Sequence, residues 1–210
     1  LMSLCESKNS DISQSAFHII TLLQSKGPAY PDFFFDVPFF NFCFSFISQK
    51  YSVVLYYSLI AIYNICCQSD QSRNYIYSQI PIDKIKSLFT HHDINVKEAA
   101  LTLSYIFLKC SNTNEYVIEI LNIVKNVLKI QDKPPNENED NEIEEKDKPL
   151  VSYSFWILVG ILRYHPELTN EIMCEQILRR TNYILDLDPD SDCAIPGFIF
   201  ISYVYEMQFA

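Results

Sequence analysis

The feature that most constrains the fold of this chain is a helix-like segment that recurs along its length. Each copy opens with one or two small residues and continues as an almost wholly apolar run. The five copies read SAFHIITLL, SLIAIYNIC, AALTLSYIF, SFWILVGIL and GFIFISYVY, and they begin at residues 15, 58, 99, 154 and 197. The spacings are therefore 43, 41, 55 and 43 residues. A recurring unit of this length predicts a stack of similar helical units.

The apolar surface of these segments is broader than that of an ordinary surface helix. In the third copy, extended to KEAALTLSYIFLK, nearly every position of the second half is apolar or aromatic. A helix on the surface of a compact domain needs only one apolar stripe. We therefore expect this helix to be held between neighbouring units. Ala99 and Ala100 are expected where helices approach closely, and Leu103, Ile106 and Phe107 are expected to face the core.

Shorter helices are predicted between successive copies of the long one. Pro38 and Pro81, 43 residues apart, each precede a short run with apolar positions at helical spacing. Proline is favoured in the first turn of a helix, where its missing N–H is not needed. Asp93 or Asn95 can cap the helix that follows. Each unit would contain a short, a medium and a long helix, and the predicted helices span 1–7, 11–26, 37–48, 52–68, 71–79, 82–90, 94–110, 113–119, 121–131, 149–164, 167–174, 175–187 and 194–209.

Residues 132–148, DKPPNENEDNEIEEKDK, interrupt this pattern. They include eight acidic residues, three basic residues and a single aliphatic residue, Ile143. Pro134 and Pro135 stop the preceding helix, and so polar a segment cannot bury enough surface to become ordered. We expect an acidic, disordered loop inserted between the second and third helices of one unit, which explains the spacing of 55 residues.

The fold expected for residues 1–210 is one all-α, right-handed α-α superhelix of about five complete or partial three-helix repeats. The chain has only three glycines, whereas sandwiches, barrels and nucleotide-binding folds use glycine in turns and phosphate loops. The sequence does not begin with methionine, and its last residues are apolar. We expect it to start and end inside a repeat, as a fragment or the ordered part of a longer protein.

Charge and cysteine content restrict the partners and the compartment. The formal net charge is −10 and lysine and arginine form no cluster, so we expect no nucleic-acid partner. The seven cysteines fall within apolar runs and include no CxxC motif, which is typical of reduced, buried thiols in an intracellular protein. The sequence has no signal peptide and no apolar run of about 18 residues. We expect no membrane span and a cytoplasmic or nuclear location.

Two segments carry a resemblance to a known repeat family. Residues 80–106 read IPIDKIKSLFTHHDINVKEAALTLSYI, and residues 37–65 read VPFFNFCFSFISQKYSVVLYYSLIAIYNI. Both place a proline at the start of a second helix and small residues in a third. This pattern resembles the armadillo repeat, and the resemblance covers the chain apart from the acidic loop. The glycine that the family usually has between its first and second helices is absent, so a HEAT-like unit is an alternative.

The resemblance implies where a partner would bind. Armadillo arrays have a concave groove lined by third helices. In their peptide-binding members, nuclear import adaptors of the importin-alpha type, each third helix shows a tryptophan and, one turn later, an asparagine. The asparagine pairs with the peptide main chain, and the indoles pack on lysine and arginine stems. The asparagine column of this chain reads Thr21, Asn64, Tyr105, Gly160 and Tyr203, and the column one turn earlier reads Phe17, Ile60, Leu101, Trp156 and Ile199.

One asparagine and one tryptophan of that ladder are present, in different repeats. The partner-binding residues expected in the groove are Asn64, Tyr105, Trp156 and Tyr203. The favoured interpretation of Trp156 alone is a large aromatic side chain buried between repeats, and the competing interpretation of Asn64 is a solvated groove residue. Tyr105 and Tyr203 are amphipathic and suit a protein-binding face.

No arrangement of residues in the sequence indicates catalysis or metal binding. His91 and His92 are adjacent on a turn, where their side chains are expected to point apart in an exposed polar loop. A solvated face is the favoured interpretation of Arg179 and Arg180, with contact to an acidic partner as the alternative. The sequence has no nucleophile elbow, phosphate loop or paired-carboxylate site. We expect no enzymatic activity and no cofactor.

The function expected from the sequence is non-catalytic protein–protein interaction. The protein would act as a scaffold or adaptor that binds a peptide or a helix in the groove, and the acidic loop would add electrostatic selectivity. A small-molecule ligand is not expected. Two alternatives stay open, a nuclear transport adaptor that recognises basic peptides and a regulatory or scaffold subunit of a kinase or phosphatase complex.

Overall fold

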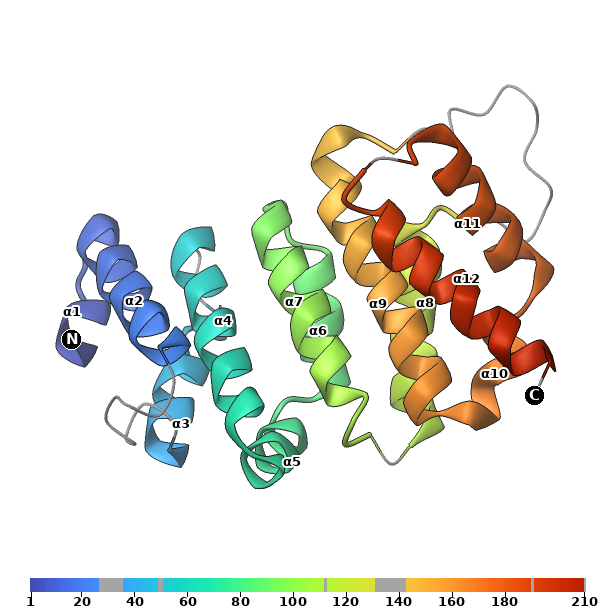
Figure 1. Ribbon diagram of the computed structural model, residues 1–210. Helices are drawn as coiled ribbons and strands as arrows, with labels where there is room; N and C mark the ends of the chain where they lie inside the picture. The colour runs from blue at the N-terminus through green and yellow to red at the C-terminus, as the bar shows by residue number, and fades with distance from the viewer. Residues whose placement is uncertain (27–35, 49–50, 112, 131–142, 190, 210) are drawn as a thin grey trace. The chain divides into compact units, whose positions relative to one another are not determined.

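The computed structural model describes residues 1–26, 36–48, 51–111, 113–130, 143–189 and 191–209. These residues form helices and connections, with no β-strand among them, as the all-α prediction requires. Their contacts divide them into two compact units, Leu1–Cys110 (unit 1) and Ser111–Ala210 (unit 2). Figure 1 labels the helices of both units. None of the described helices is both long and apolar enough to cross a lipid bilayer.

The helices of unit 1 follow the predicted order, in which a long helix closes each repeat. The long helices α2, α4 and α7 lie side by side (Figure 1), while α3 packs on α4 and α6 packs on α7. The helices are α1 (Met2–Cys5), α2 (Ser10–Ser25), α3 (Val37–Ser45) with the 3-10 turn η2 (Phe46–Ser48), α4 (Ser52–Gln68), α5 (Asp70–Gln79), α6 (Ile82–Phe89) and α7 (Ile94–Phe107).

Neighbouring side chains cap four helices of unit 1. The residues Asn9, Asp36, Ser69 and Asp93 precede α2, α3, α5 and α7. Each accepts a hydrogen bond from a backbone N–H of the first turn, at 2.8–3.0 Å. Such a cap satisfies a donor that has no partner within the helix. The prediction of a cap at Asp93 or Asn95 is therefore confirmed for Asp93.

The core of unit 1 lies between its long and its shorter helices. Phe17 of α2 packs edge-on against Phe46, with 4.9 Å between ring centroids. Tyr77 of α5 packs edge-on against Phe107 of α7 at 5.5 Å. The small and apolar positions predicted to be covered in α7 are all buried, namely Ala99, Ala100, Leu103, Ile106 and Phe107.

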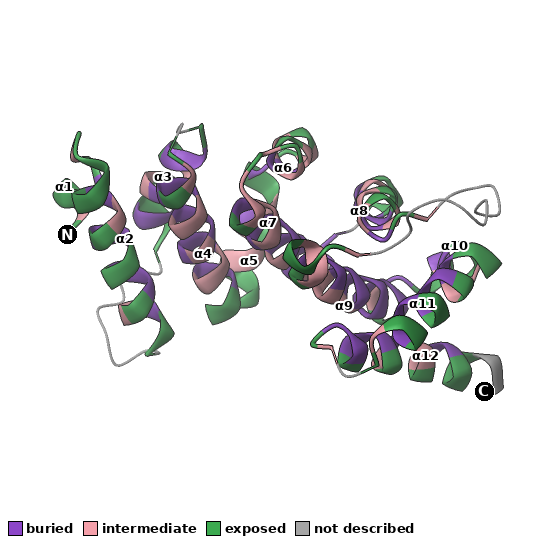
Figure 2. Ribbon diagram, turned by 90° about the horizontal axis from the view of Figure 1, so that it is seen from above, coloured by how far each residue is buried: buried purple, intermediate pink, exposed green. Residues whose placement is uncertain are grey.

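Unit 2 is built around α9, which packs against α8, α10 and α12, while α11 packs on α12. Six successive residues of α9, 157–162, are buried (Figure 2), so this part of the helix is covered on every side. The broad apolar surface of the repeated segment is thus explained most fully here. The elements are α8 (Asn114–Val127), η3 (Glu145–Asp147), α9 (Lys148–Tyr164), η4 (Pro166–Leu168), α10 (Thr169–Ile172), α11 (Glu175–Leu187) and α12 (Ala194–Phe209).

The prediction of two helices over 113–119 and 121–131 is wrong, because α8 is continuous. Its buried residues Val117, Ile120, Leu121 and Val124 form one unbroken helical stripe. The sequence at that point has no glycine or proline to break a helix, and the three-helix pattern of the repeat does not impose a break here.

The end of α8 has a definite stop signal that the sequence prediction missed. Lys129 has φ 53°, in the left-handed region. The N–H of Ile130 donates to the carbonyl of Lys125 at 2.9 Å, and that of Lys129 donates to Asn126 at 3.1 Å. This is the Schellman arrangement, which usually has glycine at the left-handed position. A lysine there conceals the helix end from sequence analysis.

Most of the acidic loop expected over 132–148 lies outside the described residues, namely 132–142. Of the rest, residues 145–147 form η3 and α9 already begins at Lys148. The disorder of the loop and the continuity of one array over residues 1–210 both stay predictions.

The small residue that opens the fifth copy has a packing reason. A Cβ atom added at Gly197 would lie 2.8 Å from Leu185 Cδ2 and 3.3 Å from Phe155 Cε2. Because real Cβ contacts are rarely this short, glycine permits the close approach of α12 to α9 and α11.

Candidate functional site

The accessible residues of the three long helices of unit 1 fall on one side of each helix. On α4 residues 57, 60 and 64 are half-buried, at a spacing of three and four residues, and on α7 the same holds for residues 98, 102 and 105. The opposite sides of both helices are buried. We call this surface the α2–α4–α7 face, and its central residues are His18, Tyr57, Ile60, Asn64, Glu98, Thr102 and Tyr105.

Side-chain contacts connect α2 and α4 along this face. The ring of His18 stacks on that of Tyr57, with 5.1 Å between centroids. The buried amide of Gln24 donates from Nε2 to the carbonyl of Ala61 at 3.4 Å and accepts from Asn64 Nδ2, also at 3.4 Å. The two helices therefore present a joined surface of rings and amides.

The side chain of Asn64 is half-buried and donates from Nδ2 to Gln24 Oε1, so it is only partly solvated. The bond length of 3.4 Å is beyond the usual range for an N–H···O hydrogen bond. Tyr105 is half-buried on the neighbouring helix α7, one turn after Thr102.

The remaining expected groove residues lie in unit 2. Trp156 is on α9 and Tyr203 on α12, and these two helices pack directly against each other. Both side chains are half-buried. Trp156 is therefore partly covered and partly accessible, and its interpretation as an aromatic buried between repeats stays a prediction. Phe155, its neighbour in sequence, is the residue that packs inward, where its ring lies 6.4 Å from that of Phe200.

The expected arrangement of His91 and His92 is also wrong. Their rings do not point apart but stack, with 4.3 Å between centroids. His91 Nδ1 accepts from the N–H of Asp93 at 3.1 Å, and His92 Nε2 lies 3.2 Å from Ser52 Oγ. Among the residues that the structure describes, no group of three or more His, Cys, Asp or Glu side chains is placed to hold a metal ion.

Arg180 has a structural role that sequence reasoning missed. Its side chain is buried, and its Nε donates to the carbonyl of Leu128 at the end of α8, at 2.7 Å. Its guanidinium also lies 5.0 Å from the centroid of the Tyr183 ring, and burial lowers its pKa. Arg179 is exposed and pairs with Glu175. The available signal was helical register, because Arg180 shares a face with the buried Ile177 and Ile184.

The prediction of buried thiols holds for most of the cysteines. Cys5, Cys43, Cys66 and Cys193 are buried, Cys67 is exposed, and all seven are free thiols. Burial raises the pKa of Cys110 to about 11 and that of Cys5 to about 12. A nucleophilic cysteine needs a lowered pKa, so these two thiols are unsuited to catalysis at neutral pH.

Solved structures resemble this chain over nearly its whole length. One is an engineered protein from the Northeast Structural Genomics Consortium, with a TM-score of 0.64, 16% identity, and 97% of this chain but 46% of that chain covered. A second engineered protein from the same consortium has a TM-score of 0.57 and 11% identity, and the match covers 97% of this chain and 96% of that chain. A designed armadillo repeat protein has a TM-score of 0.54 and 11% identity, with 97% and 98% covered.

These likenesses show the fold alone, because the identities are low. No protein-family model matches the chain, and no curated protein matches it. The chain spans about half the length of the first engineered protein, at 46%. The predicted armadillo-like, all-α repeat fold is confirmed. A helical repeat fold of this kind supports a generic binding scaffold.

Proposed function

We propose that this protein is a non-catalytic scaffold or adaptor that holds a peptide or a helix of a partner protein against the α2–α4–α7 face. The observation that carries the proposal is the row of half-buried aromatic and amide side chains on adjacent helices, with Asn64 on α4 and Tyr105 on α7. Half-buried tyrosines offer a large amphipathic contact area with few rotatable bonds to fix on binding.

The hydrogen bonds of this face suit a main chain or polar side chains of a partner. Asn64 is held by one long bond to Gln24, so its amide can turn toward a partner with little loss. Thr102 donates its hydroxyl to the carbonyl of Glu98 at 2.9 Å. Tyr105, one turn further along α7, is half-buried beside it and contributes an aromatic ring to the same face.

The two alternative functions stay predictions. A nuclear transport adaptor needs tryptophan and asparagine in successive third helices. Asn64 stands on α4 of unit 1 and Trp156, the single tryptophan of the chain, on α9 of unit 2. No observation among the described residues favours a kinase or phosphatase subunit over another kind of scaffold.

Site-specific cross-linking combined with paired substitutions tests the proposal. A photo-reactive amino acid placed at Thr102 should capture partner proteins from cells. The Asn64→Ala plus Tyr105→Ala variant should reduce this capture about tenfold, as expected for a loss of roughly 1.4 kcal/mol of binding free energy.

The matched control is Asn74→Ala plus Tyr51→Ala, which removes the same side-chain types from exposed positions outside the face. It should leave capture unchanged. The proposal fails if both double variants recover the same proteins in the same amounts as the wild-type protein.

A further inference from the structure

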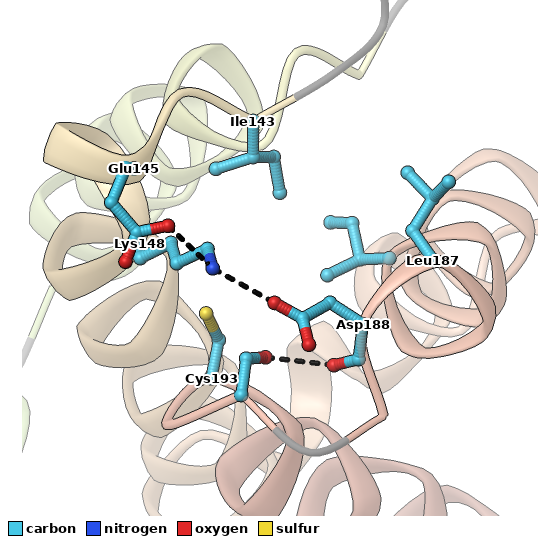
Figure 3. A pocket seen from close by; sticks show the side chains of 8 residues that line it. Ile143, Glu145, Lys148, Leu187, Asp188 and Cys193 are labelled. Atoms are coloured by element: carbon cyan, nitrogen blue, oxygen red, sulfur yellow. Dashed lines mark hydrogen bonds and ion pairs between the residues drawn. The ribbon is translucent and has the colours of Figure 1, made fainter.

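A pocket in unit 2 lies where the start of α9 meets the end of α11. Its volume is about 220 Å³. Figure 3 shows Ile143 on the side of η3 and α9 and Leu187 on the side of α11. The ion pair between Lys148 and Asp188 joins these two sides. The lining residues are Ile143, Glu145, Lys148, Ile184, Leu187, Asp188, Ser191 and Cys193.

Among the described residues that line this pocket, Lys148 is the one cation, and carboxylates already pair with it. Lys148 Nζ lies 2.8 Å from Asp188 Oδ2 and 2.6 Å from Glu145 Oε2. The hydrogen bond to Asp188 and, to a smaller extent, that to Glu145 raise the pKa of Lys148. Its ammonium group therefore stays protonated at neutral pH. An anionic ligand would therefore face one neutralised lysine and two carboxylates, and electrostatics disfavour it.

The segments next to the pocket residues in sequence are acidic, and we call their charged side chains the rim of the pocket. Within it Lys146 pairs with Glu144, and Lys148 pairs with Glu145 and Asp188. The two segments, 143–148 and 186–192 without residue 190, contain six acidic residues and two lysines, Lys146 and Lys148. Asp186 and Asp192 are exposed. A partner with positive charge is therefore complementary to this rim. Exposed charges of this kind steer a partner during association and fix its register.

The interior offers an apolar contact of limited size. Ile184 is buried, while half of Leu187 is exposed, at 50%. A cavity of about 150 Å³ lined by aliphatic side chains holds a benzene molecule. The space here is therefore sufficient for one aliphatic side chain that enters from solvent.

We infer that this pocket binds a short segment of a partner protein in which one leucine, isoleucine or valine is flanked by lysine or arginine. The aliphatic side chain packs between Ile143, Ile184 and Leu187, and the flanking cations lie over the acidic rim. A metal ion does not fit, since the described residues provide no group of ligands for one. This site belongs to unit 2 and is independent of the function proposed for the α2–α4–α7 face.

Selection from a random peptide library displayed on phage tests the inference, with the whole 210-residue chain as bait. The enriched peptides should share an aliphatic residue next to lysine or arginine. Synthetic copies of them should bind the Leu187→Glu variant about tenfold more weakly, measured by fluorescence anisotropy. The Asp186→Lys plus Asp192→Lys variant should weaken binding about tenfold at 0.05 M salt and clearly less at about 0.5 M.

Two controls separate the pocket from general surface effects. Leu22→Glu changes a leucine of equal exposure, 50%, on α2 of unit 1, and Glu206→Lys changes an exposed acid of α12. Both should leave peptide affinity unchanged. Enriched peptides that lack the aliphatic–basic pattern, or that bind the Leu187→Glu variant as well as the wild type, overturn the inference. A wild-type dimer that Leu187→Glu dissociates also overturns it, because the occupant would then be a second copy.

Discussion

Four helices of unit 1 are capped by the residue next to them in sequence, while α1, α4 and α6 have no side-chain cap. In unit 2, two helix ends are held in part by side chains far along the chain. Asn9, Asp36, Ser69 and Asp93 each cap the helix that they precede. In contrast, the residues before α8, α9, α10 and α11 make no side-chain capping hydrogen bond. Arg180 instead reaches a carbonyl 52 residues away, and Lys148 pairs with an aspartate 40 residues away.

This difference separates two ways of specifying the same kind of helix. A local cap stabilises its helix before any neighbour packs against it. A long-range contact acts only after two elements have met, so the end of α8 depends on the position of α11. We therefore expect substitutions in unit 1 to act on single helices and those in unit 2 to act on pairs of helices. The following predictions, from the largest effect to the smallest, test this comparison.

The largest difference is expected at alkaline pH, through the buried thiols of unit 1. Burial raises the pKa of Cys43 and of Cys66. A thiol in an unfolded chain has a pKa of about 8.5. When the folded-state pKa is higher, the free energy of unfolding is unaffected below about pH 8.5 and falls as the pH rises above that value. At about pH 10 these two thiols together should cost about 4 kcal/mol of unfolding free energy relative to neutral pH.

Urea unfolding followed by circular dichroism, near pH 7 and near pH 10, measures this loss. The Cys43→Ala plus Cys66→Ala variant should lose about 4 kcal/mol less stability between the two conditions than the wild type. Some loss remains, because the pKa values of Cys5 and Cys110 are also raised. Cys67→Ala removes the adjacent but exposed thiol and should lose as much as the wild type. Equal losses in all three proteins would contradict the prediction.

The Arg180→Ala substitution should destabilise unit 2 by about 3 kcal/mol, because it leaves the carbonyl of Leu128 without its donor and opens a gap in the core. The single tryptophan, Trp156, lies in unit 2, so its fluorescence in urea reports this unit. Hydrogen exchange should rise over the last turn of α8 as well as in α11.

Arg179→Ala is the matched control, since Arg179 is exposed and pairs only with an exposed glutamate. Its effect should stay below about 0.5 kcal/mol. If exchange after Arg180→Ala rises in α11 alone, the long-range description of α8 is wrong.

A cap in unit 1 should matter more than the corresponding position in unit 2. Asp93→Ala should cost about 1 kcal/mol, because it removes the acceptor for the N–H of Asn95. Thr113→Ala, before α8, removes no capping bond and should change stability by less than about 0.3 kcal/mol. Urea unfolding compares the two variants, and equal effects would remove the distinction between local and long-range helix ends.

The smallest effect is a gain. Lys129→Gly should stabilise unit 2 by about 0.5 kcal/mol, because glycine adopts the left-handed backbone of this position without strain. The midpoint of Trp156 fluorescence in urea should rise slightly. Lys125→Gly, inside α8, should instead cost about 1 kcal/mol. A loss on Lys129→Gly would show that the lysine side chain itself holds the end of α8.

The same contrast explains how much of the fold was predictable. In unit 1 the predicted helix over 52–68 agrees with α4 at both ends, because tyrosine and serine boundaries and the repeated apolar pattern lie within the segment itself. In unit 2 the predicted helices over 149–164 and 175–187 agree closely with α9 and α11. The prediction over 113–131 divides α8 and extends beyond its end. The Schellman turn at Lys129 and the bond from Arg180 have no local sequence signature.

For the candidate site, the sequence predicts on which helix, and on which side of that helix, each residue lies. Register along the repeated segment places Asn64 and Tyr105 on accessible sides of α4 and α7, and the structure agrees. Register does not reveal side-chain partners. The bond from Asn64 to Gln24 and the stack of His91 on His92 depend on which rotamers neighbouring helices permit. The pocket beside α9 joins residues from two distant segments, and no single stretch of sequence contains it.

Arg180 holds the end of α8, and Lys148 holds the start of α9 against Asp188. These two contacts bear on how the length of this repeat can change. Both ends are held by contacts within unit 2. The entropy of closing a loop rises by only about 0.6 kcal/mol when its length doubles. Insertions and deletions between residues 131 and 142 should therefore be nearly neutral for folding. That makes this connection a place where a lineage, or an engineer, can add a new segment without redesigning the repeat.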